Sequence, residues 1–335
     1  MGPRGRSRPR ALAALLLAGA GLAACSDRAP SAPIAPAAST SAEAPPPTAA
    51  TVGAVAPAIA TALPIASASA VVPTAVSAGA GERAPCPEGM ALVQRFCIDR
   101  FEAELVAPDA DGGLVQLAPN QRPPSDVRFE ARSVPGVMPQ GYVNRVEAAS
   151  ACQNAGKRLC SMREWRRACE GGRGWHWPYG ARAVVGTCNH EKGHVLSLRH
   201  GADPRRWTYE MFNDPALDVE PGFLARTGEY AGCTSAEDVH DLVGNLHEWV
   251  SDTVDAELAA KLEAEEVERN SQPWKTGNGV FMGGFFSTAD QHGPGCTFTT
   301  IAHEPTYHDY SIGFRCCAAA DLPPPARRQA TRAPR

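Results

Sequence analysis

The sequence is 335 residues long and acidic, with 36 Asp and Glu residues against 32 Lys and Arg residues. Nucleic acid is therefore not expected as a partner, because phosphate backbones are bound by basic surfaces. We interpret the excess of acidic residues as an ordinary solvated surface.

Residues 1–25 have the pattern of an export signal. Four arginines precede a short apolar run, Ala11 to Leu22, which is too short to span a bilayer as a helix. The segment ends in Leu-Ala-Ala-Cys25, which resembles a bacterial lipobox, so we expect Cys25 to be acylated and to become the mature N-terminus. The simpler alternative is an ordinary cleaved signal with a stray cysteine. Because Ser26 follows where an aspartate would resemble an inner-membrane retention signal, we expect a lipoprotein exported to the cell envelope, anchored in the outer membrane.

Residues 26–82 consist almost wholly of Ala, Pro, Ser, Thr and Val. Frequent prolines disfavour helices and strands, and the small side chains bury little apolar area. We expect a disordered linker that holds the folded domain away from the membrane. The folded domain is then expected at residues 83–320, followed by a disordered tail rich in Pro and Arg at 321–335.

Ten cysteines follow Cys25, all between Cys86 and Cys317. An even number in an exported domain indicates a disulfide framework, and the absence of Cys-x-x-Cys spacings argues against a metal cluster. Two pairs bracket a turn and a loop region and are expected to be bridged, namely Cys86 with Cys97 and Cys188 with Cys233. The partners of four cysteines stay open, namely Cys160, Cys169, Cys296 and Cys317.

The folded domain should begin with a hairpin over residues 90–102, where apolar and polar residues alternate. Residues 107–141 are rich in Pro, Gly and Asp, so we expect a loop there. Two helices should start at Asn144 and Ser161, because each of these residues is followed by a glutamate three positions later, the pattern of a capping box. Residues 255–270, rich in Ala and Glu, predict a solvated amphipathic helix.

Five segments in fixed order carry a family resemblance. They are Ala155–Trp165 (AGKRLCSMREW), Trp177–Gly180 (WPYG), Gly244–Trp249 (GNLHEW), Met282–Phe286 (MGGFF) and Gly313–Arg315 (GFR). Together they resemble the motifs of the formylglycine-generating enzyme, or sulfatase-modifying factor, family. The resemblance covers about residues 86–320 and implies an α+β, loop-rich variant of the C-type lectin fold, braced by disulfides. It also implies a Cys152–Cys316 bridge, which we rank first among the pairs.

The segment around Gly244-Asn245 is a turn flanked by carboxylates, an arrangement that could converge on a hard cation such as calcium. The expected donors are Asp241, Gly244, Leu246 and Glu248, with Asn189 as a second candidate because calcium-binding relatives place an asparagine there. The simpler interpretation is a buried Trp249 on a strand after the turn, with solvated carboxylates.

Enzymes of this family bind copper(I) through two cysteines shortly after the MGGFF-like strand and oxidise a substrate cysteine with oxygen. Here Thr288 stands at the first position, and Cys296 follows at the second after a longer loop. A hydroxyl is a poor copper(I) ligand, and one thiolate cannot provide two-sulfur coordination, so no copper is expected. Our first hypothesis is a lipoprotein that displays the domain as a binding or structural module for an unknown ligand or envelope protein.

The same region is dense in groups that transfer protons or bind metals. They are Asp290, His292, His303, Glu304, His308 and Asp309, with Tyr307 and Tyr310 as aromatic walls. The alternative hypothesis is an oxidoreductase of this family, or of its non-haem iron relatives, with Cys296, His303 and His308 as candidate catalytic residues. A polar surface without chemistry also stays open, and the even cysteine count favours Cys296 in a disulfide. Three earlier histidines, His190, His194 and His200, are expected to be solvated loop residues.

Overall fold

The computed structural model describes residues 84–265, 272–288 and 292–323. All described residues belong to one compact unit, which lies within Val76–Arg335. The predicted export signal, Cys25 and the linker lie outside the described residues, as does the tail from residue 324 on. Within the described ranges, no helix combines the length and the apolar character needed to cross a membrane.

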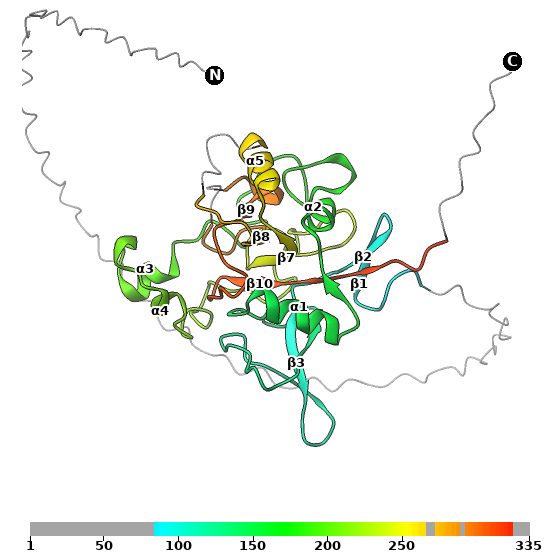
Figure 1. Cartoon of the computed structure of the whole chain (residues 1–335), viewed down its shortest axis with the longest axis horizontal. Coiled ribbons are helices and arrows are strands. Elements are labelled where there is room, and N and C mark those ends of the chain that lie inside the picture. Colours follow the sequence, from blue (N-terminus) through cyan, green and yellow to red (C-terminus); the bar gives the residue numbers. More distant parts are fainter. Residues whose placement is uncertain (1–83, 266–271, 289–291, 324–335) are drawn as a thin grey trace, which may run out of the picture. The chain divides into compact units, whose positions relative to one another are not determined.

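The first of three small sheets joins the two ends of the described domain (Figure 1). Its strand order is β1-β2-β11-β6, formed by β1 (Met90–Val93), β2 (Phe96–Asp99), β11 (Cys316–Ala319) and β6 (Arg158–Leu159). All three pairings are antiparallel, and β1 with β2 forms the predicted hairpin. The last strand of the domain therefore lies between its second strand and β6.

The second sheet includes His247, Trp249 and Phe281. Its order is β10-β7-β8-β9, formed by β10 (Ile312–Phe314), β7 (His247–Thr253), β8 (Gly279–Met282) and β9 (Thr299–Thr300). The β10–β7 pair is parallel and the other two pairs are antiparallel.

The third sheet corrects the prediction of a loop over residues 107–141. It has the order β4-β3-β5, formed by β4 (Leu114–Gln116), β3 (Glu104–Pro108) and β5 (Glu130–Arg132). The turn between β3 and β4 closes because the Asp109 carboxylate accepts hydrogen bonds from the backbone of Asp111 and Gly113. Turn-forming residues thus connect two strands here, and Leu114 stays 54% exposed, so no buried alternation marks β4.

The two predicted helices are α1 (Arg145–Asn154) and α2 (Met162–Glu170), and both begin with the expected capping box. The Asn144 side chain accepts from the Glu147 amide at 2.9 Å, and the Glu147 carboxylate accepts from the Asn144 amide at 2.9 Å. These reciprocal bonds satisfy amides that have no partner inside the helix, so both starts are fixed locally.

Other short helical segments lie between the motifs. They are α3 (Val195–His200), α4 (Tyr209–Phe212), α5 (Ala256–Glu265) and the 3₁₀ turns η1 (Gly171–Arg173), η2 (Pro204–Arg206) and η3 (Gly295–Thr297). The helix predicted at 255–270 is present up to residue 265, and residues 266–270 lie outside the described ranges. It buries Ala259 and Leu262, so it packs on the core and is not merely a solvated helix.

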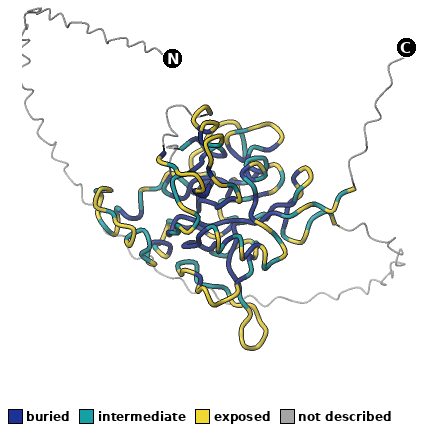
Figure 2. The backbone as a smooth tube through the Cα atoms, in the orientation of Figure 1, coloured by how far each residue is buried: buried dark blue, intermediate teal, exposed yellow. Residues whose placement is uncertain are grey.

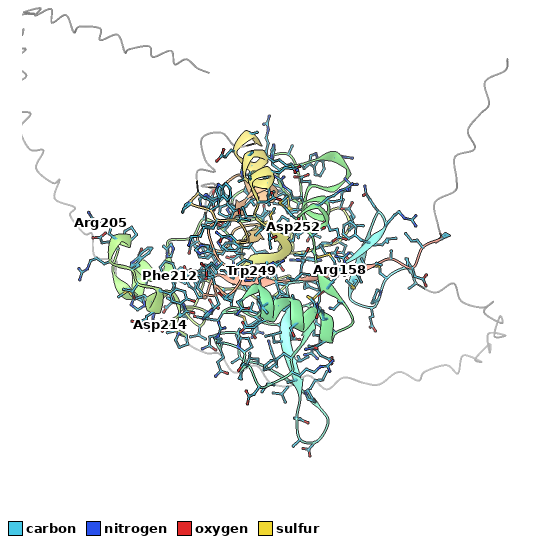
Figure 3. All side chains as sticks on the ribbon, in the orientation of Figure 1. Arg158, Arg205, Phe212, Asp214, Trp249 and Asp252 are labelled. Atoms are coloured by element: carbon cyan, nitrogen blue, oxygen red, sulfur yellow. A yellow bond between two sulfur atoms is a disulfide. The ribbon has the colours of Figure 1, made fainter. Side chains whose placement is uncertain are left out.

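Strand β7 links the two helices through neighbouring side chains that point to opposite faces. Trp249 is fully buried, donates its Nε1 hydrogen to the Val143 carbonyl at 3.0 Å and packs edge-on against Phe281. The preceding Glu248 accepts a hydrogen bond of 2.8 Å from Nε1 of Trp165 on α2. The buried segments gather in the middle of the domain (Figure 2), and Trp249 lies among them (Figure 3).

All ten cysteines of the described domain are paired. The bridges are Cys86–Cys97, Cys152–Cys316, Cys160–Cys317, Cys169–Cys296 and Cys188–Cys233. Three of them are the pairs expected from the sequence, and the four open cysteines form the other two. Because neighbouring strand residues face opposite sides, Cys316 and Cys317 tie β11 to α1 on one side and to the end of β6 on the other. The α+β, loop-rich and disulfide-braced fold class is confirmed.

Candidate functional site

A cleft of about 350 Å³ opens beside β7 and β8. Its walls are mainly rings, namely Phe212, Phe281, Phe285, Phe298, Tyr307 and Tyr310, and four imidazoles, His194, His247, His292 and His303. These residues come from segments that are far apart in the sequence. His247 lies on β7 and Phe281 on β8, and the other segments pack beside these two strands. The cleft also includes Thr288, at the position where the family resemblance implies the first copper-binding cysteine.

His247, the first residue of β7, lies on the same face of the strand as Trp249. Its ring centroid is 4.8 Å from that of Phe281 and 5.4 Å from that of Phe298, and the side chain is only 6% exposed. Its Nδ1 is buried and has no hydrogen-bond partner among the described residues. A buried polar atom without a partner is uncommon in folded proteins, so this histidine stands out as a functional candidate.

His303 lies between two rings. Its imidazole stacks on Tyr307 with a centroid distance of 3.9 Å and on Phe281 at 5.6 Å. Burial, and then the nearby His292, lowers the pKa of His303 from 6.5 to about 4. Burial and the same histidines also hold the pKa of His247 well below its usual range. Both imidazoles are therefore uncharged at neutral pH.

Asp309 is the one acidic residue among the described residues that line the cleft, and no Lys or Arg is among them. Its carboxylate accepts hydrogen bonds from the Tyr307 hydroxyl at 2.6 Å and from the Ser311 hydroxyl at 2.6 Å. Burial raises the pKa of Asp309, and these bonds act against that rise. The electrostatics of the cleft thus suit a neutral or cationic ligand better than an anionic one.

Thr288 and Cys296 stand where the family resemblance implies the two copper-binding cysteines. The Thr288 hydroxyl donates to the Phe285 carbonyl at 2.7 Å and accepts from the Phe285 amide at 2.9 Å, which closes the turn after β8. Cys296, on η3, is fully buried and bridged to Cys169. Neither residue offers a thiolate in this arrangement, so Cys296 has no free thiol for the candidate catalytic role or for a pair with His303.

The other candidate histidines are placed differently from the sequence hypotheses. His308 does not line the cleft, and its Nδ1 is instead 3.1 Å from the Tyr209 hydroxyl. His194, expected to be a solvated loop residue, packs against Trp207 at 4.5 Å and lines the cleft. His247 was missed, although its two-residue spacing from Trp249 on a predicted strand puts both on one face.

The segment expected to bind calcium forms a buried ionic cluster with Arg315. The Arg315 guanidinium donates to both carboxylate oxygens of Glu248 at 2.6 Å, and all other Arg315 bonds go to backbone carbonyls. Asp241 accepts from the Gly228 amide at 2.7 Å. Burial, and then the charges of Asp241 and Glu248, holds the pKa of Glu102 well above its usual range.

The second calcium candidate, Asn189, also faces groups of the protein itself. Its Nδ2 donates to the Phe223 carbonyl at 2.9 Å, and the Lys192 ammonium donates to the same carbonyl at 2.9 Å. In the described ranges, no three His, Cys, Asp or Glu side chains are grouped so that they could hold a metal ion. As placed, the carboxylates of Asp241 and Glu248 are engaged with groups of the protein itself, while the buried Oδ1 of Asn189 has no hydrogen-bond partner among the described residues.

Calcium binding by this segment stays a prediction from the sequence. If calcium binds the folded domain, excess chelator lowers the melting temperature, because an ion bound only to the folded state stabilises it by mass action. Melting curves recorded in chelator and in excess calcium check this. Identical curves would contradict calcium binding. They would agree with Arg315 being the cation beside Glu248 and Asp241, and with Lys192 being the cation beside Asn189.

We expect the low pKa of His303 to appear as a pH-dependent stability. A histidine whose pKa is about 4 in the folded state and 6.5 in the unfolded state stabilises the fold above pH 6.5, and this contribution is lost as the pH falls towards 4. Relative to His303→Gln, the wild type should lose on the order of 1–3 kcal/mol of unfolding free energy across this window. Denaturant unfolding at pH 7, 5.5 and 4 measures the difference, and parallel curves would contradict the assignment.

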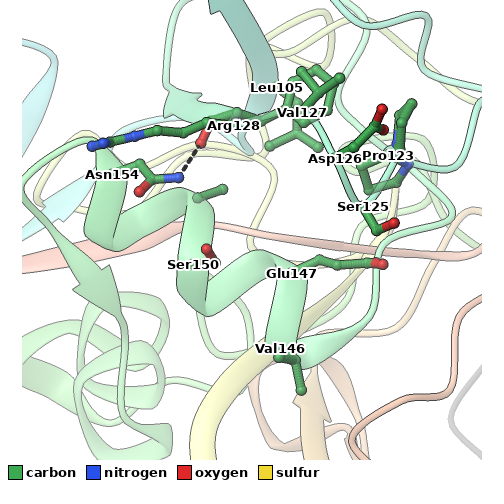
Figure 4. Close-up of a pocket in the computed structure, with 13 residues that line it drawn as sticks. Leu105, Pro123, Ser125, Asp126, Val127, Arg128, Val146, Glu147, Ser150 and Asn154 are labelled. Carbon is green, nitrogen blue, oxygen red and sulfur yellow. Dashed lines mark hydrogen bonds between the residues drawn. The ribbon is translucent and has the colours of Figure 1, made fainter.

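Another hollow, of about 470 Å³, lies between α1 and the loop over residues 123–129 (Figure 4). Its rim includes the exposed apolar side chains of Val127 and Val146, and Asn154 donates to the Phe129 carbonyl at 2.7 Å. Glu147, which lines it, is already engaged in the capping box of α1. This hollow therefore offers less chemistry than the ring-lined cleft.

Three solved structures share features of the chain at low similarity. The Major Tropism Determinant I1 Variant is 14% identical with a TM-score of 0.37, and the match covers 71% of this chain and 54% of that chain. CarF is 15% identical with a TM-score of 0.36, over 68% of this chain and 87% of that chain. Treponema denticola variable protein 1 is 12% identical with a TM-score of 0.35, over 70% of this chain and 93% of that chain. The chain thus spans about half the length of the Major Tropism Determinant variant it matches, and values this low carry no argument about function.

None of the curated proteins matches the chain. The family comparison, however, covers residues 108–320, which is well over half of the sequence and includes α1, α2, the ring-lined cleft, Glu248 and Arg315. Its match agrees with the family that the five sequence motifs resemble, and it carries the fold implied by that resemblance, a variant of the C-type lectin fold. The chain therefore belongs to the sulfatase-modifying factor enzyme 1-like domain family.

Proposed function

We propose that this protein is a cell-envelope lipoprotein that displays its sulfatase-modifying-factor domain as a ligand-binding module, without copper oxidase chemistry. The observation that carries this proposal is the pair of positions beside the cleft. The Thr288 hydroxyl is engaged with Phe285, and the Cys296 sulfur is bridged to Cys169, so neither is a thiolate. Copper(I) prefers soft sulfur ligands of this kind.

The lipoprotein part of the proposal is supported by the sequence. The lipobox-like segment ending at Cys25 and the linker over residues 26–82 are the features expected of a domain held on a lipid tether. Five disulfides within the described domain fit an oxidising compartment outside the cytoplasm, since such bridges are rare in reducing ones.

The first test is an oxidase assay with copper. The purified protein, loaded with copper(I) under oxygen, is incubated with a sulfatase-type peptide that contains the target cysteine. We expect no formylglycine product and no tightly bound copper, because no pair of thiolates is present beside the cleft. Product formation above the peptide-only control would overturn the proposal.

The second test concerns the ligand that the cleft accepts. Its ring walls and the single carboxylate of Asp309, with no Lys or Arg, favour aromatic ligands that are neutral or cationic. Tyramine and 4-hydroxyphenylacetate form a matched pair, since they carry the same ring with opposite charge. We expect tyramine to bind about tenfold or more tightly by calorimetry, given about 0.5–2 kcal/mol for a cation on ring faces and the added charge effect. Equal affinities, or tighter binding of the carboxylate, would contradict this electrostatic reading of the cleft.

A second candidate function, a metal-dependent oxidoreductase related to the non-haem iron enzymes, rests on one observation. His247 and His303 line the same cleft as uncharged imidazoles, the form in which histidine binds metals. Titration with iron(II) and zinc, with His303→Gln as the comparison, tests it. Tight binding that His303→Gln abolishes would favour the enzyme, and the absence of binding would remove its basis.

A further inference from the structure

A hollow of about 980 Å³ runs along α2, on a part of the domain separate from the ring-lined cleft. It extends from the β1–β2 turn to α5. Arg158, one of the residues that line it, is labelled in Figure 3. Six of its lining residues are basic, namely Arg95, Arg158, Arg163, Arg166, Arg167 and Lys261. Two are acidic, Glu164 and Glu170. We call this hollow the basic groove.

The two acidic residues of the basic groove are each paired with an arginine of the same groove, so they do not neutralise its other basic side chains. Glu164 is bound by both ends of the Arg158 guanidinium, at 2.7 and 2.6 Å, and Glu170 lies 3.7 Å from Nε of Arg166. Arg163 is exposed, and no hydrogen bond or ion pair engages it in the described part of the chain. Six basic and two acidic side chains thus line the groove, on a chain whose overall charge is −4.

The basic groove lies next to the place where the chain enters and leaves the domain. Arg95, at the β1–β2 turn, donates from Nη2 to the Pro323 carbonyl at 2.9 Å. The Asp321 amide donates to the Pro85 carbonyl at 2.8 Å, so the two ends of the described domain meet there. The sequence before this point is the linker that leads back to Cys25, and the sequence after it contains four further arginines.

We propose that the basic groove docks the domain onto an anionic phospholipid surface. Charge complementarity supplies the attraction, because clustered Lys and Arg side chains bind anionic headgroups at about 1 kcal/mol each. The observation that favours lipid over other polyanions is the position of the groove at the attachment point of the tether. The lipid anchor itself belongs to the proposed function, whereas the groove is tested without it.

The experiment uses the chain from residue 26 on with Cys25 absent, so that no acyl chain contributes. Vesicles of equal parts phosphatidylglycerol and phosphatidylcholine should bind it at low salt, vesicles of phosphatidylcholine alone should not, and added salt should weaken binding. Arg95→Gln with Arg163→Gln should weaken binding to the anionic vesicles about 30-fold, since two contributions of about 1 kcal/mol each correspond to that ratio.

The matched control is Arg182→Gln with Arg206→Gln, which removes the same charge from two exposed arginines outside the basic groove. We expect this control to bind within about twofold of the wild type, and all variants to have unchanged melting temperatures. If both double variants bind the anionic vesicles equally weakly, the loss of affinity follows from the net charge of the protein and not from the basic groove. This result would overturn the proposal. Absence of binding to anionic vesicles would also overturn it, including the case in which a soluble polyanion such as heparin binds instead.

Discussion

Replacing Arg315 by methionine should destabilise the domain by about 3–5 kcal/mol, because it leaves a buried carboxylate without its partner. Arg315 and Glu248 are both buried and joined by two hydrogen bonds of 2.6 Å. The same guanidinium donates to three backbone carbonyls, those of the neighbouring Asp99 and Arg100 and that of His240, so its loss removes a partner from each of them as well. Denaturant unfolding of the purified variant measures the change.

Two further variants test whether the loss of stability in Arg315→Met comes from the buried ion pair. Glu248→Gln combined with Arg315→Met should be less destabilised than the sum of the single variants, since Glu248 is then no longer a buried carboxylate without its partner. Asp238→Asn breaks the Arg100–Asp238 ion pair, whose side chains are 40% and 54% exposed, and should change stability by no more than about 1 kcal/mol. Similar losses for Asp238→Asn and Arg315→Met would show that burial of the Arg315 pair is not what matters.

Removing the Cys169–Cys296 bridge with two alanines should cost about 3–5 kcal/mol and also weaken ligand binding in the cleft. The bridge spans 127 residues, and cross-links of long loops restrict the unfolded chain most. It also fixes η3, which positions Phe298 beside His247. Unfolding in denaturant and tyramine binding are the two measurements.

The control for this prediction is the double alanine variant of Cys86 and Cys97. That bridge spans 11 residues at the edge of the domain, so its removal should cost less, about 3 kcal/mol or below, and leave tyramine binding unchanged. If tyramine affinity falls equally in both variants, the Cys169–Cys296 bridge has no particular role in shaping the cleft.

The features predicted well from the sequence are those decided by neighbouring residues. The capping boxes at Asn144 and Ser161 need only a residue three positions away, and the β1–β2 hairpin needs only its own alternation. The features predicted poorly depend on distant partners. Nothing near Cys169 indicates that it pairs with Cys296, and nothing near Leu114 indicates that β3 pairs with it.

The candidate site shows the same limit. His303 and Asp309 were found because the region is dense in polar groups, and both line the cleft. His247 and His194 were not identified as site residues from the sequence. Their contacts with Phe281, Phe285 and Trp207 exist only in the folded chain. Arg315 was read as part of a family motif, while its pairing with Glu248 depends on the close approach of β7 and the end of β10.

The place of β11 sets a condition on when this protein can fold. Its first sheet and two of its bridges require Cys316 and Cys317, which leave the ribosome after almost all other residues of the domain. Until then, Cys152 and Cys160 have no correct partner, and β2 and β6 have no strand between them. The domain therefore completes its fold only after nearly all of its residues have been synthesised, and its dependence on contacts between distant residues predicts slow maturation that benefits from catalysts of disulfide exchange.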